Sequence, residues 1–405
     1  MATLAGHPAV AALRVPAFRR YLLGQLPSVT CSWAQVVALS WVVVGLNPHA
    51  LGWVVALQFL PSLLLGPWFG AVTDRYDRRR LLMLAEAGLG LIALSYALVS
   101  AAGGLGLPVI YLLVTAWGVL NALDTPARRA LVPMLIPREL GGSASALTGT
   151  VLLVGMTAGS ALGAALVGVA GPTVAFAVNA ASFAADVVLL WTIRSGASPL
   201  VGRAPGQIRA GLRYVWHTPA LRTALLVLAV VATFSFTVQV TAPVFVLVSL
   251  HGGASLVGIA FTAGAAGSLA GALTAAALGG PGPQAITRAT LGMAAALAVT
   301  AAAPTVPVAL AGLAGVGFAW SILIAAVIAT LQHAEASMTG RVMATLSVVL
   351  LGGMAAGGPV ASAEIALAGP RTALALSAAA ALIAAQLSHS HQPGPTIARK
   401  AGDPP

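Results

Sequence analysis

Residues 70–80 read Gly70-Ala-Val-Thr-Asp74-Arg75-Tyr-Asp77-Arg78-Arg79-Arg80 and carry six charged side chains, the densest charge in the chain. They lie between an uncharged stretch, 21–73, and a largely apolar one, 81–127. Six charges in eleven residues cannot cross hydrocarbon, so the stretch is predicted to be a short loop at a membrane surface. Four of the six are arginines, and short loops rich in arginine stay on the cytoplasmic side. The other segments can be placed relative to this loop.

The composition is that of a polytopic membrane protein. Of the 405 residues, 59% are hydrophobic and 7% are charged, whereas a soluble domain carries about 25% charged residues. This deficit excludes an ordinary soluble enzyme. The net charge of +11 would suit a nucleic-acid-binding protein, but the arginines are scattered between apolar stretches, so no nucleic-acid partner is expected. The single cysteine, Cys31, excludes an intramolecular disulfide, and the first apolar stretch is too long for a cleavable signal peptide.

The apolar stretches are each long enough to cross a membrane twice. Residues 21–73 would form about 80 Å of helix against about 30 Å of hydrocarbon, so they are predicted to form two spans with a turn at Asn47-Pro48-His49. The same argument gives two spans in each of five further stretches, 81–127, 140–193, 223–287, 289–334 and 342–389. The total is twelve spans. The breaks inside these stretches are expected near Gly103-Gly104, Gly171-Pro172, His251-Gly252, Pro304-Thr-Val-Pro307 and Gly369-Pro370.

The placement of arginine and lysine predicts the orientation. With a cytoplasmic N-terminus, 19 of the 20 arginine and lysine residues fall in inside segments, and only Arg371 falls outside. The positive-inside rule then places both termini in the cytoplasm. The expected location is a bacterial-type cytoplasmic (inner) membrane.

The spans divide into two halves of six. Residues 1–194 are predicted to form the first half and residues 222–389 the second, the arrangement of an internal repeat. Residues 195–221 are the one long internal loop, a cytoplasmic linker. Residues 390–405 are polar and proline-rich, which predicts a disordered cytoplasmic tail.

The linker is predicted to contain an amphipathic helix. Its apolar residues Ile208, Leu212, Val215 and Trp216 fall on one helical face, with arginines elsewhere. Such a helix lies on the inner leaflet of a membrane. A plain linker without a helix is the alternative.

The charged loop also resembles a known motif. Gly70-x3-Asp74-Arg75-x2-Arg78-Arg79, between spans 2 and 3, resembles the signature loop of the major facilitator superfamily in residue types, position and sidedness. Asp77 departs from the pattern, which usually has glycine there. Since aspartate tolerates left-handed backbone better than most residues, the tight turn is expected to persist. The resemblance implies an all-α membrane protein with twelve transmembrane helices in two pseudo-symmetric six-helix halves.

A wider resemblance, to the enterobactin-exporter and macrolide-efflux branch of drug:proton antiporters, covers nearly the whole chain. It is weaker in the second half, where the loop between spans 8 and 9 has no acid. The resemblance implies proton-driven export of a small, often amphipathic compound. It rests on Phe18-Arg19-Arg20, Ser32-Trp33-x-Gln35, Leu57-Gln58-Phe59-Leu60-Pro61, Asn121-Ala122-Leu123-Asp124-x-Pro126-Ala127-Arg128 and Gly340-Arg341-Val342-Met343-Ala344.

Two spans carry repeated glycines. Gly155-x3-Gly159-Ser160-x2-Gly163 in span 5 resembles the glycine-rich motif of antiporters, with Ser160 in place of a proline. Gly353-x3-Gly357-Gly358-Pro359 in span 11 is a loose counterpart. Such glycines allow close, adjustable helix contacts, which suits two halves that rock against each other. Plain packing without a gating role is the alternative.

Two carboxylates inside the spans are candidate proton carriers. Glu86 lies about one and a half turns into span 3, and Asp186 lies about two turns from Arg194 in span 6, so their depths match. Because intramembrane carboxylates are costly, each is a functional candidate. By the resemblance, spans 3 and 6 are peripheral, so structural pairing or snorkelling is the alternative to proton carriage.

The resemblance implies that spans 1, 4, 7 and 10 line the substrate cavity. Their polar and aromatic side chains are the candidate cavity residues, and packing is the alternative role for the aromatic ones. These candidates are Gln35, Trp41, Trp117, Asn121, Phe236, Gln239 and Trp320.

A gating role is expected for the signature loop and its surroundings. We predict that Asp74, Arg78 and Asp124 form one cytoplasmic network, because all three lie at one depth. By the resemblance, the acid at Asp74 also faces the start of span 11, where a helix N-terminus attracts negative charge. The alternative is that the arginines of the loop only set the orientation of the chain in the membrane. The gating candidates are Gly70, Asp74, Arg75, Arg78, Arg79, Asp124, Arg128, Gly340 and Arg341.

The predicted function is secondary active export of a drug, siderophore or secondary metabolite by proton antiport with alternating access. The expected partners are the small-molecule substrate, protons and the lipid bilayer, and a monomer is expected. No nucleotide-binding loop, Ser-His-Asp set or metal-ligand spacing is visible in the sequence, so neither an enzyme nor a cofactor or metal is expected. The alternatives are uptake or lipid translocation through the same fold and, from another class, a non-transporting membrane sensor or scaffold.

Overall fold

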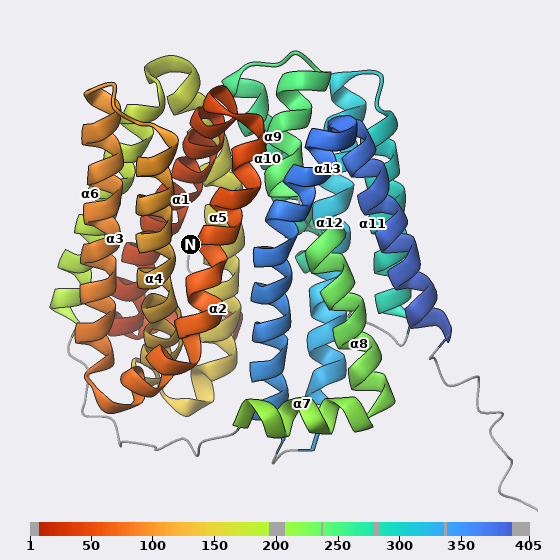
Figure 1. The fold of residues 1–405 in the computed structure, drawn as a ribbon. Coiled ribbons are helices and arrows are strands. Elements are labelled where there is room, and N and C mark those ends of the chain that lie inside the picture. The colour runs from red at the N-terminus through yellow and green to blue at the C-terminus, as the bar shows by residue number, and fades with distance from the viewer. Residues whose placement is uncertain (1–7, 194–206, 236–237, 279–283, 336–337, 391–405) are drawn as a thin grey trace, which may run out of the picture.

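The computed structural model describes residues 8–193, 207–235, 238–278, 284–335 and 338–390, and these residues are almost entirely helical (Figure 1). The helices of the first half are α1 (Pro16–Leu46), α2 (Leu51–Arg75), α3 (Arg78–Ala101), α4 (Leu107–Leu131), α5 (Gly141–Ala170) and α6 (Pro172–Thr192). They are followed by α7 (Gln207–His217), α8 (Pro219–Val230), α9 (Val238–Ser249), α10 (Ala254–Ala277), α11 (Ala285–Ala302), α12 (Val306–Gln332) and α13 (Thr339–Ser390). We call the end of the bundle where α2 turns into α3 the inner end, following the predicted orientation, and the opposite end the outer end.

The prediction of twelve spans is confirmed. Eleven segments of the described chain are long and apolar enough to cross a membrane. The last of them, α13, has 52 residues and is broken at Gly369, whose φ is 81°. At about 1.5 Å per residue this length is more than twice the hydrocarbon thickness, so α13 holds the eleventh and twelfth spans. The seventh span consists of α8, a π-helical turn (Val231–Ser235) and α9.

The two halves repeat a backbone pattern. Gly171 and Gly369 precede a proline, have φ of 82° and 81°, and lie 198 positions apart. Positive φ favours glycine, and proline suits the first turn of the helix that follows. The glycines at 155 and 159 precede those at 353 and 357 by the same 198 positions. The exact limits of the halves stay a prediction, and most of the predicted linker before Gln207 and the tail after Ser390 lie outside the described residues.

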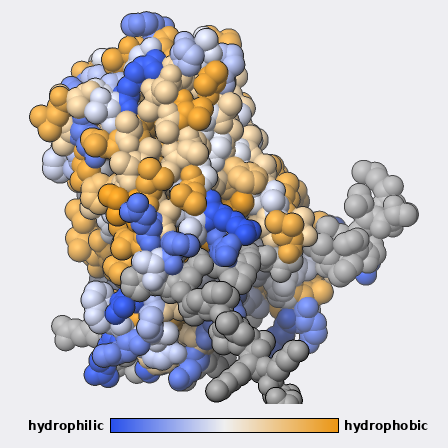
Figure 2. Space-filling model, turned by 90° about the vertical axis from the view of Figure 1, so that its right-hand side faces the viewer, coloured by the Kyte–Doolittle hydropathy of each residue, from blue (hydrophilic) through white to orange (hydrophobic). Residues whose placement is uncertain are grey.

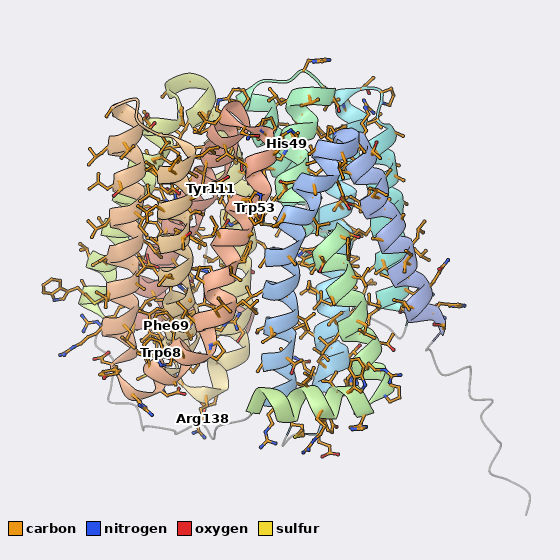
Figure 3. The ribbon with its side chains drawn as sticks, in the orientation of Figure 1. His49, Trp53, Trp68, Phe69, Tyr111 and Arg138 are labelled. Carbon is orange, nitrogen blue, oxygen red and sulfur yellow. The ribbon has the colours of Figure 1, made fainter. Side chains whose placement is uncertain are left out.

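The surface fits a membrane environment. Figure 2 shows hydrophobic and weakly polar residues over much of one face, with hydrophilic residues at both its upper and its lower end. Trp53 lies toward the outer end of α2 and Trp68 toward its inner end (Figure 3), and both side chains are exposed. Tryptophan is enriched at both membrane–water interfaces, so the two rings are placed where an aromatic belt is expected.

The turn between α2 and α3 forms by a different mechanism from the one predicted. Asp77 has φ −61° and ψ 111°, which is ordinary extended backbone and not left-handed backbone. Its carboxylate accepts hydrogen bonds from the N–H groups of Arg79 (2.9 Å) and Arg80 (3.2 Å). Asp77 is therefore the N-cap of α3, and capping, not left-handed geometry, explains why an acid replaces the usual glycine.

Helix α7 lies across the inner end of the second half (Figure 1). Val215 is 2% exposed and packs into the core of that half. Leu212 and Trp216 are 50% and 57% exposed. A Cβ on Gly211 would lie 2.6 Å from the Arg341 carbonyl oxygen, so α7 packs directly on the start of α13. The single apolar face predicted for this helix is thus divided between the protein core and the surface, and the side chain of Ile208 lies outside the described ones.

The two halves meet along two pairs of helices, α2 with α13 and α5 with α10. Near the outer end, Gly52 donates its N–H to Ser362 Oγ at 3.0 Å, and a Cβ on Gly258 would overlap Ala164. On the inner part of α2, a Cβ on Gly66 would meet no atom within 4 Å. The close contacts between the halves that these glycines mark lie toward the outer end.

Candidate functional site

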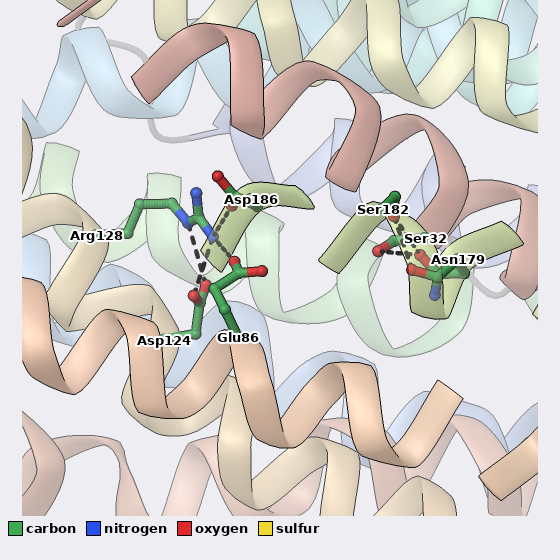
Figure 4. A network of polar contacts seen from close by, with 7 residues as sticks. All are labelled: Ser32, Glu86, Asp124, Arg128, Asn179, Ser182 and Asp186. Atoms are coloured by element: carbon green, nitrogen blue, oxygen red, sulfur yellow. Dashed lines mark hydrogen bonds and ion pairs between the residues drawn. The ribbon is translucent and has the colours of Figure 1, made fainter. Parts of the chain in front are cut away.

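Three carboxylates of the first half meet one guanidinium, that of Arg128 on α4 (Figure 4). Arg128 bonds Asp124 through Nη2 to Oδ1 at 3.1 Å and through Nε to Oδ2 at 3.3 Å. The same Nη2 donates to Glu86 Oε1 on α3 and lies 3.9 Å from Asp186 Oδ2 on α6. We call these four residues the acid cluster. Three helices contribute to it, so it forms only when the first half is assembled.

The acid cluster is buried and has an excess of negative groups. Glu86 and Asp186 are each 1% exposed and Asp124 is 8% exposed. If all three carboxyl groups were ionised, one arginine would leave two negative charges uncompensated in an apolar environment. Removing an unpaired ion from water costs several kcal/mol. The arrangement therefore suits groups that bind a proton.

Local structure explains how the cluster assembles. Asp124 and Arg128 are four residues apart on α4, so their side chains lie on one face and pair. The guanidinium carbon of Arg128 is 5.9 Å from the ring centroid of Tyr21 on α1. Beside Tyr21, a Cβ on Gly24 would overlap the carboxylate of Asp186. Glycine at this position therefore lets the acid of α6 lie directly against the backbone of α1.

The structure brings the two predicted proton-carrier candidates together. Glu86 and Asp186, separated by 100 positions in the sequence, both contact Arg128. The sequence reasoning placed Arg128 with the gating residues and missed it as the partner of these acids. The four-residue spacing of Asp124 and Arg128 was the signal that could have identified a buried ion pair in span 4.

The signature loop holds the inner end of α6. Arg79 donates from Nε to the Leu190 carbonyl at 2.8 Å and from Nη2 to the Trp191 carbonyl at 2.5 Å. Arg20 of α1 donates to the next carbonyl, that of Thr192, at 3.2 Å. The last carbonyls of a helix have no partner within the helix, and arginine satisfies them well. Two arginines thus fix the end of the helix that carries Asp186.

The other gating candidates lie at the inner ends of helices. Arg78 Nη1 lies 3.2 Å from Met134 Sδ, and Arg341 Nη1 lies 3.4 Å from Met338 Sδ. Asp124 pairs with Arg128. That Asp124 also forms one network with Asp74 and Arg78 stays a prediction. Gly70, Asp74 and Arg75 belong to the last turns of α2, and Gly340 and Arg341 to the first turn of α13.

A second polar group lies along α6, further from the inner end (Figure 4). Asn179 donates from Nδ2 to Gln35 Oε1 at 2.9 Å. Its Oδ1 accepts from Ser182 Oγ at 3.3 Å and from Ser32 Oγ at 3.4 Å. Gln35, a candidate cavity residue, is therefore directed to α6 within the first half.

The remaining cavity candidates are distributed over both halves. Gln239 borders a small hollow between the halves. Trp41 packs against a cluster that includes residues of both halves, whereas Trp117 packs in the first half and Trp320 in the core of the second. Asn121 is half-buried on α4, and Phe236 lies outside the described residues. The hollow is lined by Val55, Phe59, Ala232, Gln239, Val240, Met354 and Gly358.

Among the residues that the structure describes, no group of three or more histidine, cysteine, aspartate or glutamate side chains is arranged to hold a metal ion. The three carboxylates of the acid cluster surround an arginine, and its positive charge occupies the position that a cation would need.

Residues 7–399 match the sequence model of a family described as transmembrane secretion effectors. The staphyloferrin A transporter of Staphylococcus aureus is 34% identical over 107 residues, which are 26% of this chain and 27% of that protein. The multidrug efflux pump Tap of Mycolicibacterium fortuitum is 27% identical over 212 residues, 49% of this chain and 51% of that protein. Macrolide efflux protein A of Enterococcus faecalis is 33% identical over 85 residues, 20% of this chain and 26% of that protein. The chain thus aligns with about a quarter to a half of the length of these relatives.

Solved structures with the same fold cover nearly the whole chain. A bacterial homologue of the human lysosomal transporter Spinster, in an inward-facing and occupied conformation, has a TM-score of 0.73 and 14% identity, and the match covers 93% of this chain and 96% of that one. A bacterial homologue of the iron transporter ferroportin, in an inward-facing state, has a TM-score of 0.71 and 16% identity, with 93% and 98% of the two chains covered. At these identities the similarity concerns the fold alone.

Proposed function

Because the chain belongs to the transmembrane secretion effector family of major facilitator transporters, we propose that it exports a small organic compound in exchange for protons. The members with which it aligns are transporters and not enzymes. The efflux named for two relatives supports the direction of transport. The siderophore named for a third supports a substrate class of drugs, siderophores or secondary metabolites. The acid cluster is the observation that carries the proton part of the proposal.

The charge balance of the acid cluster supports proton binding. Glu86, Asp124 and Asp186 share one arginine in a region where solvent does not compensate charge. Binding one or two protons brings the net charge of the cluster toward zero. Intramembrane carboxylates that face the interior of a bundle mark proton relays in pumps and transporters. Glu86 and Asp186 are the carriers in this proposal, and Arg128 sets their charge.

The position of the cluster also offers a way to couple protons to movement of the halves. Arg128 lies on α4, which packs on α2, and Tyr21 and Gly24 lie on α1, which packs on α5. Both α2 and α5 contact the second half. Loss of a proton would increase the attraction between Arg128 and the remaining carboxylates and so change how α1 and α4 pack. Because the tight contacts between the halves lie toward the outer end, this conformation is the inward-facing one in the proposed cycle.

The proposed orientation follows from the arginines. With both termini in the cytoplasm, the signature loop and α7 lie on the inside of a cytoplasmic membrane. The gating candidates then form a latch at the inner end that stabilises the outward-facing state. The proposed substrate contacts are Gln239, which borders the hollow between the halves, and Trp41, which packs against residues of both halves.

Transport by everted membrane vesicles tests the proposal. A panel of radiolabelled macrolides, siderophores and cationic dyes would be offered to vesicles with and without the protein. We expect at least one compound to accumulate when an inwardly acidic pH gradient is present, and to leave when nigericin dissipates the gradient. Glu86→Gln and Asp186→Asn should abolish gradient-driven accumulation. Glu139→Gln, which alters an exposed acid in the short helical turn (Arg138–Leu140) before α5, should leave accumulation unchanged.

Three results would contradict this function. Accumulation that persists without a gradient and requires ATP would overturn proton coupling. Accumulation in right-side-out vesicles in place of everted ones would indicate uptake. Binding without translocation would favour a sensor or scaffold.

A further inference from the structure

We propose that the contact between α1 and α6 is a hydrated polar passage through which protons travel between the acid cluster and the middle of the membrane. The proposal rests on the proposed proton coupling and assigns a role to residues beyond the acid cluster. The passage consists of Tyr21, Gln25, Ser28, Ser32 and Gln35 of α1 with Asn179, Ser182 and Asp186 of α6.

The two helices present matching polar faces. On α1 the five residues are spaced by four, three, four and three positions, and on α6 the three residues are spaced by three and four. Both spacings keep side chains on one side of a helix. Helices α1 and α6 pack on each other, and Gly24 brings the carboxylate of Asp186 against α1. The polar faces therefore lie within the first half, away from the lipid.

The passage extends through much of the membrane. From Asp186 to Asn179 the rise along α6 is about 10 Å, and from Tyr21 to Gln35 along α1 it is about 21 Å. One end is the acid cluster near the inner end, and the other is the Gln35–Asn179 hydrogen bond. Interhelical contacts in membranes usually need only small residues and an occasional polar one, so a continuous polar face of this length calls for a further explanation.

One buried polar atom of the passage beyond the acid cluster, Gln25 Oε1, has no hydrogen-bond partner in the described protein. Within or against the acid cluster, Tyr21 Oη, Glu86 Oε2, Arg128 Nη1 and both Asp186 oxygens lack a hydrogen bond of normal geometry. Tyr21 and Gln25 are almost completely buried. Buried polar groups are nearly always hydrogen-bonded, to protein or to ordered water, and internal waters occupy polar sites with two to four such partners. Water is therefore the ligand that this set of atoms would bind.

Infrared spectroscopy of the purified protein in nanodiscs tests the passage without a known substrate. A protonated carboxyl of the acid cluster gives a carboxylic-acid carbonyl band that Glu86→Gln or Asp186→Asn removes. After transfer into D₂O, the rate at which this band shifts reports how fast the proton exchanges with solvent. We expect Gln25→Met and Asn179→Leu to slow the shift about tenfold or more, which corresponds to a barrier raised by ~1.4 kcal/mol, and Gln25→Glu to restore it.

Thr30→Val is the matched control. Thr30 lies on α1 and donates to its own helix, at the Leu26 carbonyl, so the shift should keep its wild-type rate. A band that exchanges at the wild-type rate in both Gln25→Met and Asn179→Leu overturns the passage and leaves the proton site in place. A spectrum with no band removed by either acid substitution overturns the proton site, and the passage with it. If Gln25→Met does not fold, Ser182→Ala provides the same measurement.

Discussion

The two halves of the protein share a backbone pattern but bury different chemistry. Both turn at a Gly-Pro pair with nearly identical positive φ, at Gly171 and at Gly369. The first half buries carboxylates and amides, whereas every buried polar side chain in the described part of the second half is a serine or threonine. Many of these hydroxyls donate to their own helix, as Thr290 does to the Ile286 carbonyl and Thr300 to the Ala296 carbonyl, each at 2.8 Å.

This difference separates two tasks that a rocking transporter must perform. Close helix contacts depend on backbone shape, which a repeat can supply equally to both halves. A hydroxyl satisfied by its own helix carries no charge and places few constraints on its neighbours. Buried carboxylates need partners from several helices, and one copy of the acid cluster is sufficient for one proton pathway. The proposed division is that both halves move and the first half handles charge.

Removal of Arg128 from the first half and of Arg371 from the second should show the largest contrast in stability between the halves. Arg128→Met leaves three buried carboxyl groups without their counter-ion, and breaking such a buried pair costs about 3–5 kcal/mol. Arg371 of the second half donates to the Ala301 carbonyl at 2.8 Å and lies 5.4 Å from the Phe245 ring centroid. Arg371→Met should cost only about 1–2 kcal/mol, because a carbonyl and a ring are left and not an ion. Thermal unfolding in detergent compares the two variants.

Combining Arg128→Met with Glu86→Gln and Asp186→Asn should recover much of the lost stability. Equal losses in the two single arginine variants, or no recovery in the triple variant, would show that the first half does not depend on its buried charge.

The proposed latch at the inner end is a second difference between the halves. The corresponding loop of the second half, between spans 8 and 9 at residues 279–283, has no acidic residue. Asp74→Asn and Arg78→Ala should insert normally and lose export, since a broken charge-assisted hydrogen bond of about 1.5–3 kcal/mol is comparable with a conformational balance of a few kcal/mol. Expression level and export rate in vesicles are the measurements. If the arginines served topology alone, Asp74→Asn would be silent. Wild-type export in both Asp74→Asn and Asp124→Asn at normal expression would exclude the latch.

Where the halves are alike, the same substitution should have the same effect. A Cβ on Gly159 would overlap the Thr30 carbonyl oxygen, and a Cβ on Gly357 would lie 2.5 Å from that of Thr233. Gly159→Ala and Gly357→Ala should therefore each cost about 1–3 kcal/mol through overpacking. Gly45→Ala, which would meet no atom within 4 Å, should be neutral or slightly stabilising. Unfolding temperatures that differ widely between the first two variants would contradict an equivalent role for these glycines.

Cysteine labelling tests the orientation with the least disturbance of the protein. In a Cys31→Ser background, Leu367→Cys at the outer end and Tyr76→Cys at the inner end replace exposed side chains, so neither should change stability measurably. In intact cells, an impermeant thiol reagent should label position 367 and not position 76. The opposite pattern would reverse the proposed placement of both halves.

The sequence by itself determined the number of spans, their breaks and the expected sidedness. These properties depend on local quantities: the length of an apolar run against the membrane thickness, the cost of charge in hydrocarbon, and the backbone preferences of Gly171-Pro172 and Gly369-Pro370. The structure confirmed the twelve spans and the expected breaks. The prediction for Asp77 was right about the tight turn and wrong about its cause, because an N-cap and a left-handed residue both favour aspartate.

The tertiary structure alone decided which side chains meet. Glu86 and Asp186 were recognised as costly and as equal in depth, but their shared partner Arg128 emerged only when α3, α4 and α6 were assembled. Gln35 was expected in the central cavity; its amide accepts a hydrogen bond from Asn179 of α6, and its place in the cavity stays a prediction. The physical reason is that membrane helices are apolar on most sides, so their sequences contain little information about rotation around the helix axis. Packing sets that rotation, and with it whether a polar side chain faces the cavity, joins an ion pair or lies in the proposed proton passage.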